Sequence, residues 1–180
     1  ILLLGETGTG KSYLARMMYE YARQKDIIGP EGQYVSVNCA EYANNAELFL
    51  TNLFGYRKGA YTGADKDRKG LIAMSDGGVL FLDEVHCLSS QCQEKLFHFM
   101  DKGQYHMVGD NERWYTARTR IVMATTENPE MALLKTLTRR IPLVTRLAAL
   151  EDRPQQEKKE ILYSLLCQEE QRIERQIRIV

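Results

Sequence analysis

The chain has 180 residues, a length that allows one domain to bury a core without disulfide or metal staples. Apolar residues make up 44% and charged residues 27%, and no apolar run reaches the ~18 residues of a membrane-spanning helix, so we expect a soluble, cytoplasmic protein with no membrane partner. Lys plus Arg equals Asp plus Glu at 24 each, so net charge provides no field for holding nucleic acid, which argues against DNA binding by this segment.

An apolar strand over residues 1–4 opens the chain and leads into a glycine-rich loop. The loop matches the pattern G-x-x-x-x-G-K-[ST], in which backbone N–H groups turn toward a phosphate and the N-terminus of the next helix adds partial positive charge. We expect Lys11 to reach the outer phosphates of ATP and Ser12 to give its hydroxyl to Mg²⁺. A purely structural glycine turn would explain neither the lysine nor the order of strand, loop and helix. The predicted ATP-binding residues are Gly5, Glu6, Thr7, Gly8, Thr9, Gly10, Lys11, Ser12 and Tyr13.

The helix after this loop is predicted over residues 13–24. Its apolar residues recur at helical spacing and indicate one buried face made of Leu14, Met17, Met18 and Tyr21. The chain starts inside the strand, with nothing before it to close a sheet or contact an adenine base. We therefore expect a piece of a longer protein.

A second strand and helix precede the most unusual stretch of the chain. Residues 34–38 alternate as a short strand, and residues 46–53 follow as an amphipathic helix. Residues 54–70 hold four glycines among basic residues and keep no sustained apolar period. That composition predicts a loop inserted beside a helix.

A carboxylate pair follows a continuous apolar run of the kind found in strands that are covered on both faces. The run occupies residues 79–82, and Asp83 and Glu84 come directly after it. A carboxylate at the end of a buried strand can hold Mg²⁺ through water, and an adjacent one can polarise the attacking water, so we predict these roles for Asp83 and Glu84. The alternative is that the pair only caps the next helix. Ser90 and Gln93 indicate a capping box for that helix.

Another buried strand is predicted over residues 121–124 and ends in two threonines. Hydrolysis needs a group that senses the γ-phosphate, and the hydroxyl of either Thr125 or Thr126 could serve; we favour Thr126. Turn chemistry at a strand end is the alternative. The alternation of strands with helices predicts an α/β fold with a doubly wound parallel sheet flanked by helices.

Two arginines and a charged tail complete the chain. Arg139 and Arg140 could neutralise transition-state charge on the ATP of a neighbouring subunit, or could be solvated surface residues. The tail over residues 155–175 carries one apolar helical face, made of Ile161, Leu162, Leu165, Leu166 and Ile173. The cysteines form no C-x-x-C pair, so we expect reduced thiols at Cys39, Cys87, Cys92 and Cys167.

Six residues of the glycine-rich stretch resemble the GAFTGA loop of bacterial enhancer-binding proteins, the AAA+ ATPases that activate sigma-54 RNA polymerase. They are Gly59, Ala60, Tyr61, Thr62, Gly63 and Ala64, with Tyr61 in place of phenylalanine. The resemblance covers essentially all 180 residues. It implies an AAA+ P-loop NTPase fold, ATP and Mg²⁺ as cofactors, and a homo-oligomeric, hexameric ring. It also implies that the six residues contact sigma-54, with Tyr61 and Thr62 at the tip.

The same resemblance gives roles to residues whose spacing alone gives none. Asn38 resembles the residue that restrains the catalytic glutamate. Arg140 matches the second arginine finger of the family, whereas Leu134 stands where the family places the first. Thr126 stands where an asparagine commonly follows the sensor threonine. A second pore loop that moves with the first is implied at Val108, Gly109 and Asp110.

Three further stretches resemble the LevR-like branch of this family, which components of the sugar phosphotransferase system control. They are residues 83–86, 124–129 and 138–142. The resemblance implies phosphotransferase-system proteins acting on other domains, and DNA bound through domains outside this chain. His86 is interpreted as a helix-entry residue typical of the family, neither a metal ligand nor a phosphorylation site. We expect residues 1–180 to be an AAA+ core truncated at both ends, with the helical lid missing.

The main hypothesis is an ATP-hydrolysing activator core that remodels sigma-54 RNA polymerase holoenzyme to open promoter complexes at a sugar phosphotransferase operon. One alternative is a general AAA+ helicase or protein-remodelling motor, whose loop at residues 59–64 holds another polymer. The other alternative is a nucleotide-gated scaffold that binds ATP without hydrolysing it, and Glu84 argues against that.

Overall fold

The computed structural model describes the backbone of residues 1–177 and the side chains of residues 1–167, 169 and 170. It divides into two compact units, one of residues 1–147 and one that begins at Ala148, and each is described by itself. Within those described residues, no helix is both long enough and apolar enough to cross a membrane.

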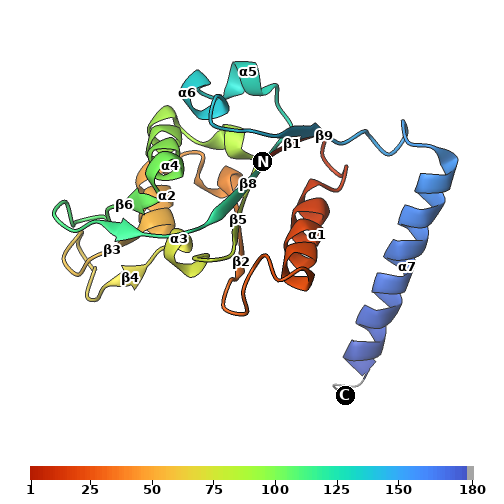
Figure 1. The fold of residues 1–180 in the computed structure, drawn as a ribbon, viewed down its shortest axis with the longest axis horizontal. Helices are drawn as coiled ribbons and strands as arrows, with labels where there is room; N and C mark the ends of the chain where they lie inside the picture. Colours follow the sequence, from red (N-terminus) through yellow and green to blue (C-terminus); the bar gives the residue numbers. More distant parts are fainter. Residues whose placement is uncertain (178–180) are drawn as a thin grey trace. The chain divides into compact units, whose positions relative to one another are not determined.

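Five parallel strands form the central sheet of the first unit, in the order β2-β5-β8-β1-β9. They are β1 (Leu2–Leu4), β2 (Tyr34–Asn38), β5 (Val79–Asp83), β8 (Arg120–Thr125) and β9 (Val144–Arg146). Figure 1 shows α1 (Lys11–Gln24) on one face of the sheet, with α2 (Ala46–Phe54) and α4 (Ser90–Lys102) on the other. The predicted doubly wound parallel sheet is confirmed.

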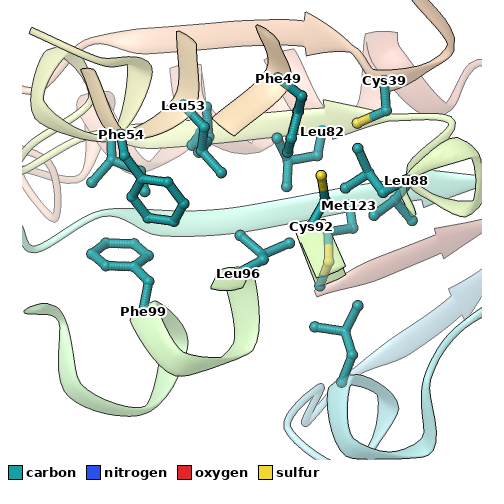
Figure 2. Close-up of a cluster of buried hydrophobic side chains, with 14 of the residues drawn as sticks. Cys39, Phe49, Leu53, Phe54, Leu82, Leu88, Cys92, Leu96, Phe99 and Met123 are labelled. Carbon is teal, nitrogen blue, oxygen red and sulfur yellow. The ribbon is translucent and has the colours of Figure 1, made fainter. Parts of the chain in front are cut away.

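Alternation along the strands sends successive side chains into two cores. On β5, Leu82 packs into the larger core beside α2 and α4, whereas Phe81 packs into the smaller core with Ala15 of α1. Figure 2 shows Phe49 of α2 and Leu96 of α4 in the larger core, with Leu82 beside Phe49. Burial on both faces explains the continuous apolar run of β5 and fixes the position of its carboxyl end.

Short elements fill the connections of the first unit, and one long helix forms the second. The short helices are η1 (Cys39–Tyr42), α3 (Leu71–Met74), η2 (Val85–Cys87), α5 (Pro129–Ala132) and α6 (Lys135–Thr138). The antiparallel pairs are β3 (Gly55–Tyr56) with β4 (Arg68–Lys69), and β6 (Gln104–Tyr105) with β7 (Tyr115–Thr116). The predicted tail helix is confirmed as α7 (Gln155–Ile177); Ile173 of its expected apolar face lies outside the described side chains. All four cysteines are free, as predicted.

The prediction of a plain loop over residues 54–70 was wrong in part, because β3 and β4 pair there as a hairpin directly after α2. A Cβ on Gly55 would lie 2.4 Å from the backbone oxygen of Arg68, and a Cβ on Gly70 would lie 2.3 Å from the nitrogen of Gly55. The glycines that indicated a loop therefore allow two backbones to approach closely.

The predicted buried face of α1 was wrong for two residues, since Met17 is 44% exposed and Tyr21 is 59% exposed. The helix begins at Lys11, two residues earlier than predicted. Ala15 is buried against the smaller core, and its short side chain lets the helix axis lie close to the sheet.

The predicted capping box of α4 was also wrong. Ser89, not Ser90, is the N-cap, and its hydroxyl oxygen accepts a hydrogen bond from the N–H of Cys92 at 3.3 Å. Gln93 is buried and makes two contacts with neighbouring segments instead. Its amide donates to the oxygen of Leu88 at 2.9 Å and accepts from the N–H of Leu134 at 2.8 Å, which ties α4 to the start of α6.

Candidate nucleotide site

The glycine-rich loop between β1 and α1 has the backbone conformation that a phosphate cradle needs. Gly8 and Gly10 have φ angles of 83° and 92°, in the left-handed region that favours glycine. At Gly5 the requirement is space, because a Cβ there would lie 2.7 Å from Thr9 Oγ1. Gly10 is the N-cap of α1 and provides no side-chain cap, so the first N–H groups of the helix face the loop.

Lys11 is held inside this loop. Its side chain is 6% exposed, and its ammonium group donates hydrogen bonds to the backbone oxygens of Gly5 at 2.8 Å and Glu6 at 3.0 Å. A buried ammonium group held by carbonyl oxygens is well suited to exchange one of them for a phosphate oxygen, a stronger, charged acceptor.

Ser12 and Asp83 bring two oxygen ligands together from α1 and β5. The Ser12 hydroxyl donates to Asp83 Oδ2 at 3.0 Å, and the other carboxylate oxygen of Asp83 accepts from the N–H of Glu84 at 3.0 Å. One hydroxyl and one carboxylate beside a phosphate cradle form the kind of hard-oxygen set that Mg²⁺ prefers. These residues therefore fit the predicted magnesium ion.

Glu84 lies where β5 and β8 end side by side. Its φ of 48° is in the left-handed region, which costs a non-glycine residue on the order of 1 kcal/mol and turns the chain sharply into η2. Its Oε2 atom accepts a hydrogen bond from Thr126 Oγ1 at 3.2 Å. Thr125 is fully buried next to it, and its hydroxyl oxygen accepts from the N–H of Glu127 at 3.1 Å. Of the two threonine side chains, that of Thr126 thus contacts Glu84 directly.

His86 joins this group, which sequence reasoning did not foresee. Its Nδ1 atom lies 3.0 Å from Thr125 Oγ1 and 3.4 Å from Glu84 Oε2. Glu84 and His86 lie beyond the end of β5, and residues two apart do not face each other on a helix, so spacing gave no signal of this contact. The contact arises because the left-handed Glu84 and the tight turn of η2 fold the chain back.

A cavity of about 650 Å³ lies beside the Ser12–Asp83 contact, and Ser12, Asn38 and Asp83 form part of its wall. Asn38 is the register partner of Asp83 in the sheet. Its side-chain oxygen accepts from the N–H of Ala40 at 3.0 Å and so caps η1. Asn38 therefore lies beside the site, and its predicted restraint of Glu84 stays a prediction.

Arg139, the C-cap of α6, and Arg140 lie in the turn after that helix. Arg140 Nε donates to Asp101 Oδ1 of α4 at 2.5 Å, and its guanidinium lies 4.5 Å from the centre of the Phe97 ring. The hydrogen bond from Arg140 lowers the pKa of Asp101. In the described part of the chain, no hydrogen bond or ion pair joins either arginine to the phosphate loop or to Glu84. A role for them in the same subunit's site is not supported.

Residues 59–64 form the tip of the β3–β4 hairpin, which the N–H of Gly59 closes by donating to the oxygen of Ala64 at 2.8 Å. Tyr61 is 48% exposed, and its ring packs 5.1 Å from that of Tyr56. Thr62 and Gly63 are exposed as well. The tip thus presents side chains to the surface while its backbone is held by hydrogen bonds.

The stretch expected to be a second pore loop packs directly on this hairpin. Val108 donates its N–H to the oxygen of Gly55 at 2.9 Å and accepts from the N–H of Arg57 at 3.0 Å. A Cβ on Gly109 would lie 2.7 Å from the Cβ of Ala60. We name residues 55–69 and 108–110 together the paired loops.

Comparison with known proteins agrees with this combination of features. A family model described as Sigma-54 interaction domain matches residues 1–151. The chain is 42% identical to transcriptional regulatory protein LevR of Bacillus subtilis strain 168 over 179 residues, which is 99% of this chain and 19% of that protein. It is 41% identical to transcriptional regulatory protein DagR of Salmonella typhimurium strain 14028s, with the same coverage of 99% and 19%. The chain thus spans about a fifth of the length of these curated relatives.

Crystal structures of NtrX from Brucella abortus have the same fold. The complex with ADP matches at a TM-score of 0.67 and 26% identity, covering 83% of this chain and 32% of that one. The complex with ATP matches at a TM-score of 0.68 and 24% identity, and that match speaks for the fold alone. The predicted AAA+ P-loop fold is confirmed. On the family match and these likenesses, the chain belongs to the Sigma-54 interaction domain family.

Proposed function

We propose that this domain hydrolyses ATP with Mg²⁺ and uses the energy to move the loop at residues 59–64 against sigma-54 RNA polymerase holoenzyme, so that promoter complexes open. The observation that carries the proposal is a continuous series of contacts, in which Ser12 bonds Asp83, Asp83 bonds the N–H of Glu84, and Glu84 accepts from Thr126. This series joins the phosphate loop to the ends of two strands. Membership in the Sigma-54 interaction domain family supports the choice of partner.

In this proposal the glycine-rich loop binds ATP. Its N–H groups and Lys11 bind phosphate oxygens, and exposed Tyr13 in the first turn of α1 borders the nucleotide. Ser12 and Asp83 would hold Mg²⁺, which when bound offsets the negative charge that develops on the phosphates.

In this proposal Glu84 is the general base of hydrolysis and takes a proton from the water that attacks the γ-phosphate. The hydrogen bond from Thr126 orients the carboxylate before the water arrives. Thr125 or Thr126 then senses the γ-phosphate, and Asn38 restrains Glu84 until the sensor is engaged.

The route from this site to the paired loops is short along the chain. Asn38 ends β2 and caps η1, and α2 follows η1 after only three residues. Gly55, the C-cap of α2, is already the first residue of the hairpin. A shift of Asn38 and η1 would therefore be passed through α2 to residues 59–64 as the displacement of one rigid helix.

Assembly would bring further positive charge to the site, beyond that of Lys11 in the phosphate loop. We propose a homo-oligomeric, hexameric ring in which Arg140, with Arg139 beside it, approaches the nucleotide of the neighbouring subunit. Its contact with Asp101 holds the guanidinium in one orientation until then. Arg140→Ala should cut turnover at least ~10³-fold while sparing ATP binding, and preserved turnover would reject the assignment.

The rest of the assignment concerns the longer protein to which residues 1–180 belong as its AAA+ core. Similarity to LevR and DagR supports a transcriptional regulator. We propose control by phosphotransferase-system proteins acting on other domains, DNA binding through further domains, action on a sugar phosphotransferase operon, and a cytoplasmic location.

The decisive experiment uses the full-length protein in a promoter-opening assay with purified polymerase. With ATP present, opening is expected with sigma-54 holoenzyme and not with holoenzyme that carries another sigma factor. Opening with both would favour a general motor or helicase instead. ATP binding without phosphate release would favour the nucleotide-gated scaffold.

A further inference from the structure

His86 lies between the two strands that carry the hydrolytic residues, and the function proposed above leaves it without a task. Its Nδ1 atom is 3.0 Å from Thr125 Oγ1 at the end of β8 and 3.4 Å from Glu84 Oε2 beyond the end of β5. Val85, directly before it, is fully buried and anchors η2 to the larger core. The imidazole is therefore held against both strand ends.

The neighbour of the other ring nitrogen indicates which nitrogen carries the proton. Cys87 Sγ lies 3.5 Å from His86 Nε2. Burial, and then the nearby charges of Glu84 and Glu127, raise the pKa of the Cys87 thiol, so the sulfur keeps its proton and can donate it to Nε2. An Nε2 atom that accepts leaves the proton of a neutral imidazole on Nδ1.

The two oxygen atoms near Nδ1, Thr125 Oγ1 and Glu84 Oε2, can both accept a hydrogen bond, which supports a proton on that nitrogen. A carboxylate oxygen accepts hydrogen bonds, so a proton on Nδ1 would face an acceptor in Glu84 Oε2 at 3.4 Å. Thr125 Oγ1 has two lone pairs, and it can accept from the N–H of Glu127 and from Nδ1–H together. An Nδ1–H group would thus donate to Thr125 Oγ1 at 3.0 Å and lie 3.4 Å from Glu84 Oε2, close enough to attract the carboxylate.

We propose that His86 is a positioning residue, whose Nδ1–H fixes the Glu84 carboxylate relative to Thr125 so that the general base stays in line with the nucleotide. The inference rests on the proposed hydrolysis of ATP by Glu84. The side chains of His86 and Glu84 are 20% and 23% exposed, so water competes for only part of the contact. Thr126 donates to the same Oε2 atom, so the carboxylate oxygen lies between the Thr126 hydroxyl and the His86 ring, and contacts on two sides restrict its rotamer.

Three substitutions in the full-length protein separate positioning from packing. His86→Asn places an amide N–H close to the former Nδ1 position, whereas His86→Gln places one nearer to Nε2. His86→Leu keeps a similar volume and removes every donor. His98→Leu, on the exposed face of α4, is the matched control outside the site.

The measurements are steady-state turnover and the equilibrium affinity for ATP. His86→Leu and His86→Gln should lower kcat about 10- to 100-fold, while ATP affinity changes less than about 2-fold. His86→Asn should recover turnover to within about 3-fold of the wild type, and His98→Leu should match the wild type. In a Glu84→Gln background, adding His86→Leu should change the residual turnover less than about 2-fold, because the histidine acts through Glu84.

The outcomes distinguish the inference from the proposed function. Turnover by the wild type together with full turnover by His86→Leu overturns the inference alone. Equal losses in His86→Asn and His86→Leu also overturn it, in favour of packing. A further loss of turnover when His86→Leu is added to Glu84→Gln would show that His86 does not act through Glu84, and would overturn the inference. Absence of turnover in the wild type overturns the proposed function and the inference with it.

Discussion

The nucleotide site and the paired loops are held in place by different means. The site residues lie at or just beyond the ends of strands that are buried on both faces. Thr125, the last residue of β8, is itself fully buried. In the paired loops, backbone hydrogen bonds and close glycine contacts do most of the holding, and the tip side chains Tyr61 and Thr62 are exposed. A region fixed by a core keeps catalytic atoms aligned, whereas a region fixed by a few hydrogen bonds can move at low cost. We expect the first to generate the force and the second to deliver it.

The largest effect, on ATP turnover, is expected from a change in the nucleotide site. Glu84→Gln removes the general base while keeping a side chain of the same shape, so turnover should fall about 10²- to 10⁴-fold with ATP affinity nearly unchanged. Phosphate release and ATP binding by calorimetry measure the two quantities. Turnover within a few-fold of the wild type would mean that another group activates the water.

The next effect concerns the hairpin that carries the tip. Gly70→Ala would place a methyl group 2.3 Å from the nitrogen of Gly55, which the backbone must relieve by moving. We expect a loss of about 1–3 kcal/mol of unfolding free energy, measured by denaturant titration. Gly29→Ala is the matched control, because its Cβ would meet nothing within 4 Å. Equal stabilities of the two variants would show that the hairpin tolerates separation of its strands.

A smaller effect, on promoter opening, is expected where the two loops touch. Gly109→Ala would bring a methyl group 2.7 Å from the Cβ of Ala60 and strain a φ of 82°. The loops should separate, so promoter opening should fall more than about 10-fold while turnover stays within about 3-fold of the wild type. Parallel losses of both activities would show that the loops feed back on the nucleotide site.

The smallest effect comes from Asp110, whose pKa is lowered by hydrogen bonds from the N–H of Arg113 and the hydroxyl of Tyr115. A carboxyl with a lowered folded-state pKa stabilises the fold above its ordinary pKa of about 4 and loses that contribution as pH falls through the folded value. Asp110→Asn should therefore lower the melting temperature slightly at pH 7, and the difference should shrink at acid pH. Asp65→Asn, in the exposed part of the hairpin, is the control. A difference that grows on acidification would contradict this account.

The sequence allowed the sheet and its strand ends to be predicted because buried parallel strands produce continuous apolar runs, as at residues 79–82. Ser12 and Asp83 were each predicted to hold Mg²⁺, and the structure shows the two side chains in contact at 3.0 Å. The hairpin was missed because Gly55 and Gly70 are equally compatible with a loop, and only the folded structure shows which backbones approach them. The contacts of His86 with Glu84 and Thr125 were not foreseen because they depend on the left-handed φ of Glu84, which no residue pattern indicates.

The central claim is that hydrolysis at Glu84 drives the tip at Thr62, and one comparison on the full-length protein tests it most directly. Turnover and promoter opening are measured together for the wild type and for Thr62→Ala. The account predicts turnover within about 2-fold of the wild type for Thr62→Ala, with promoter opening abolished, because the proposed function assigns the exposed hydroxyl to contact with the polymerase. Opening at the wild-type rate by Thr62→Ala would contradict it.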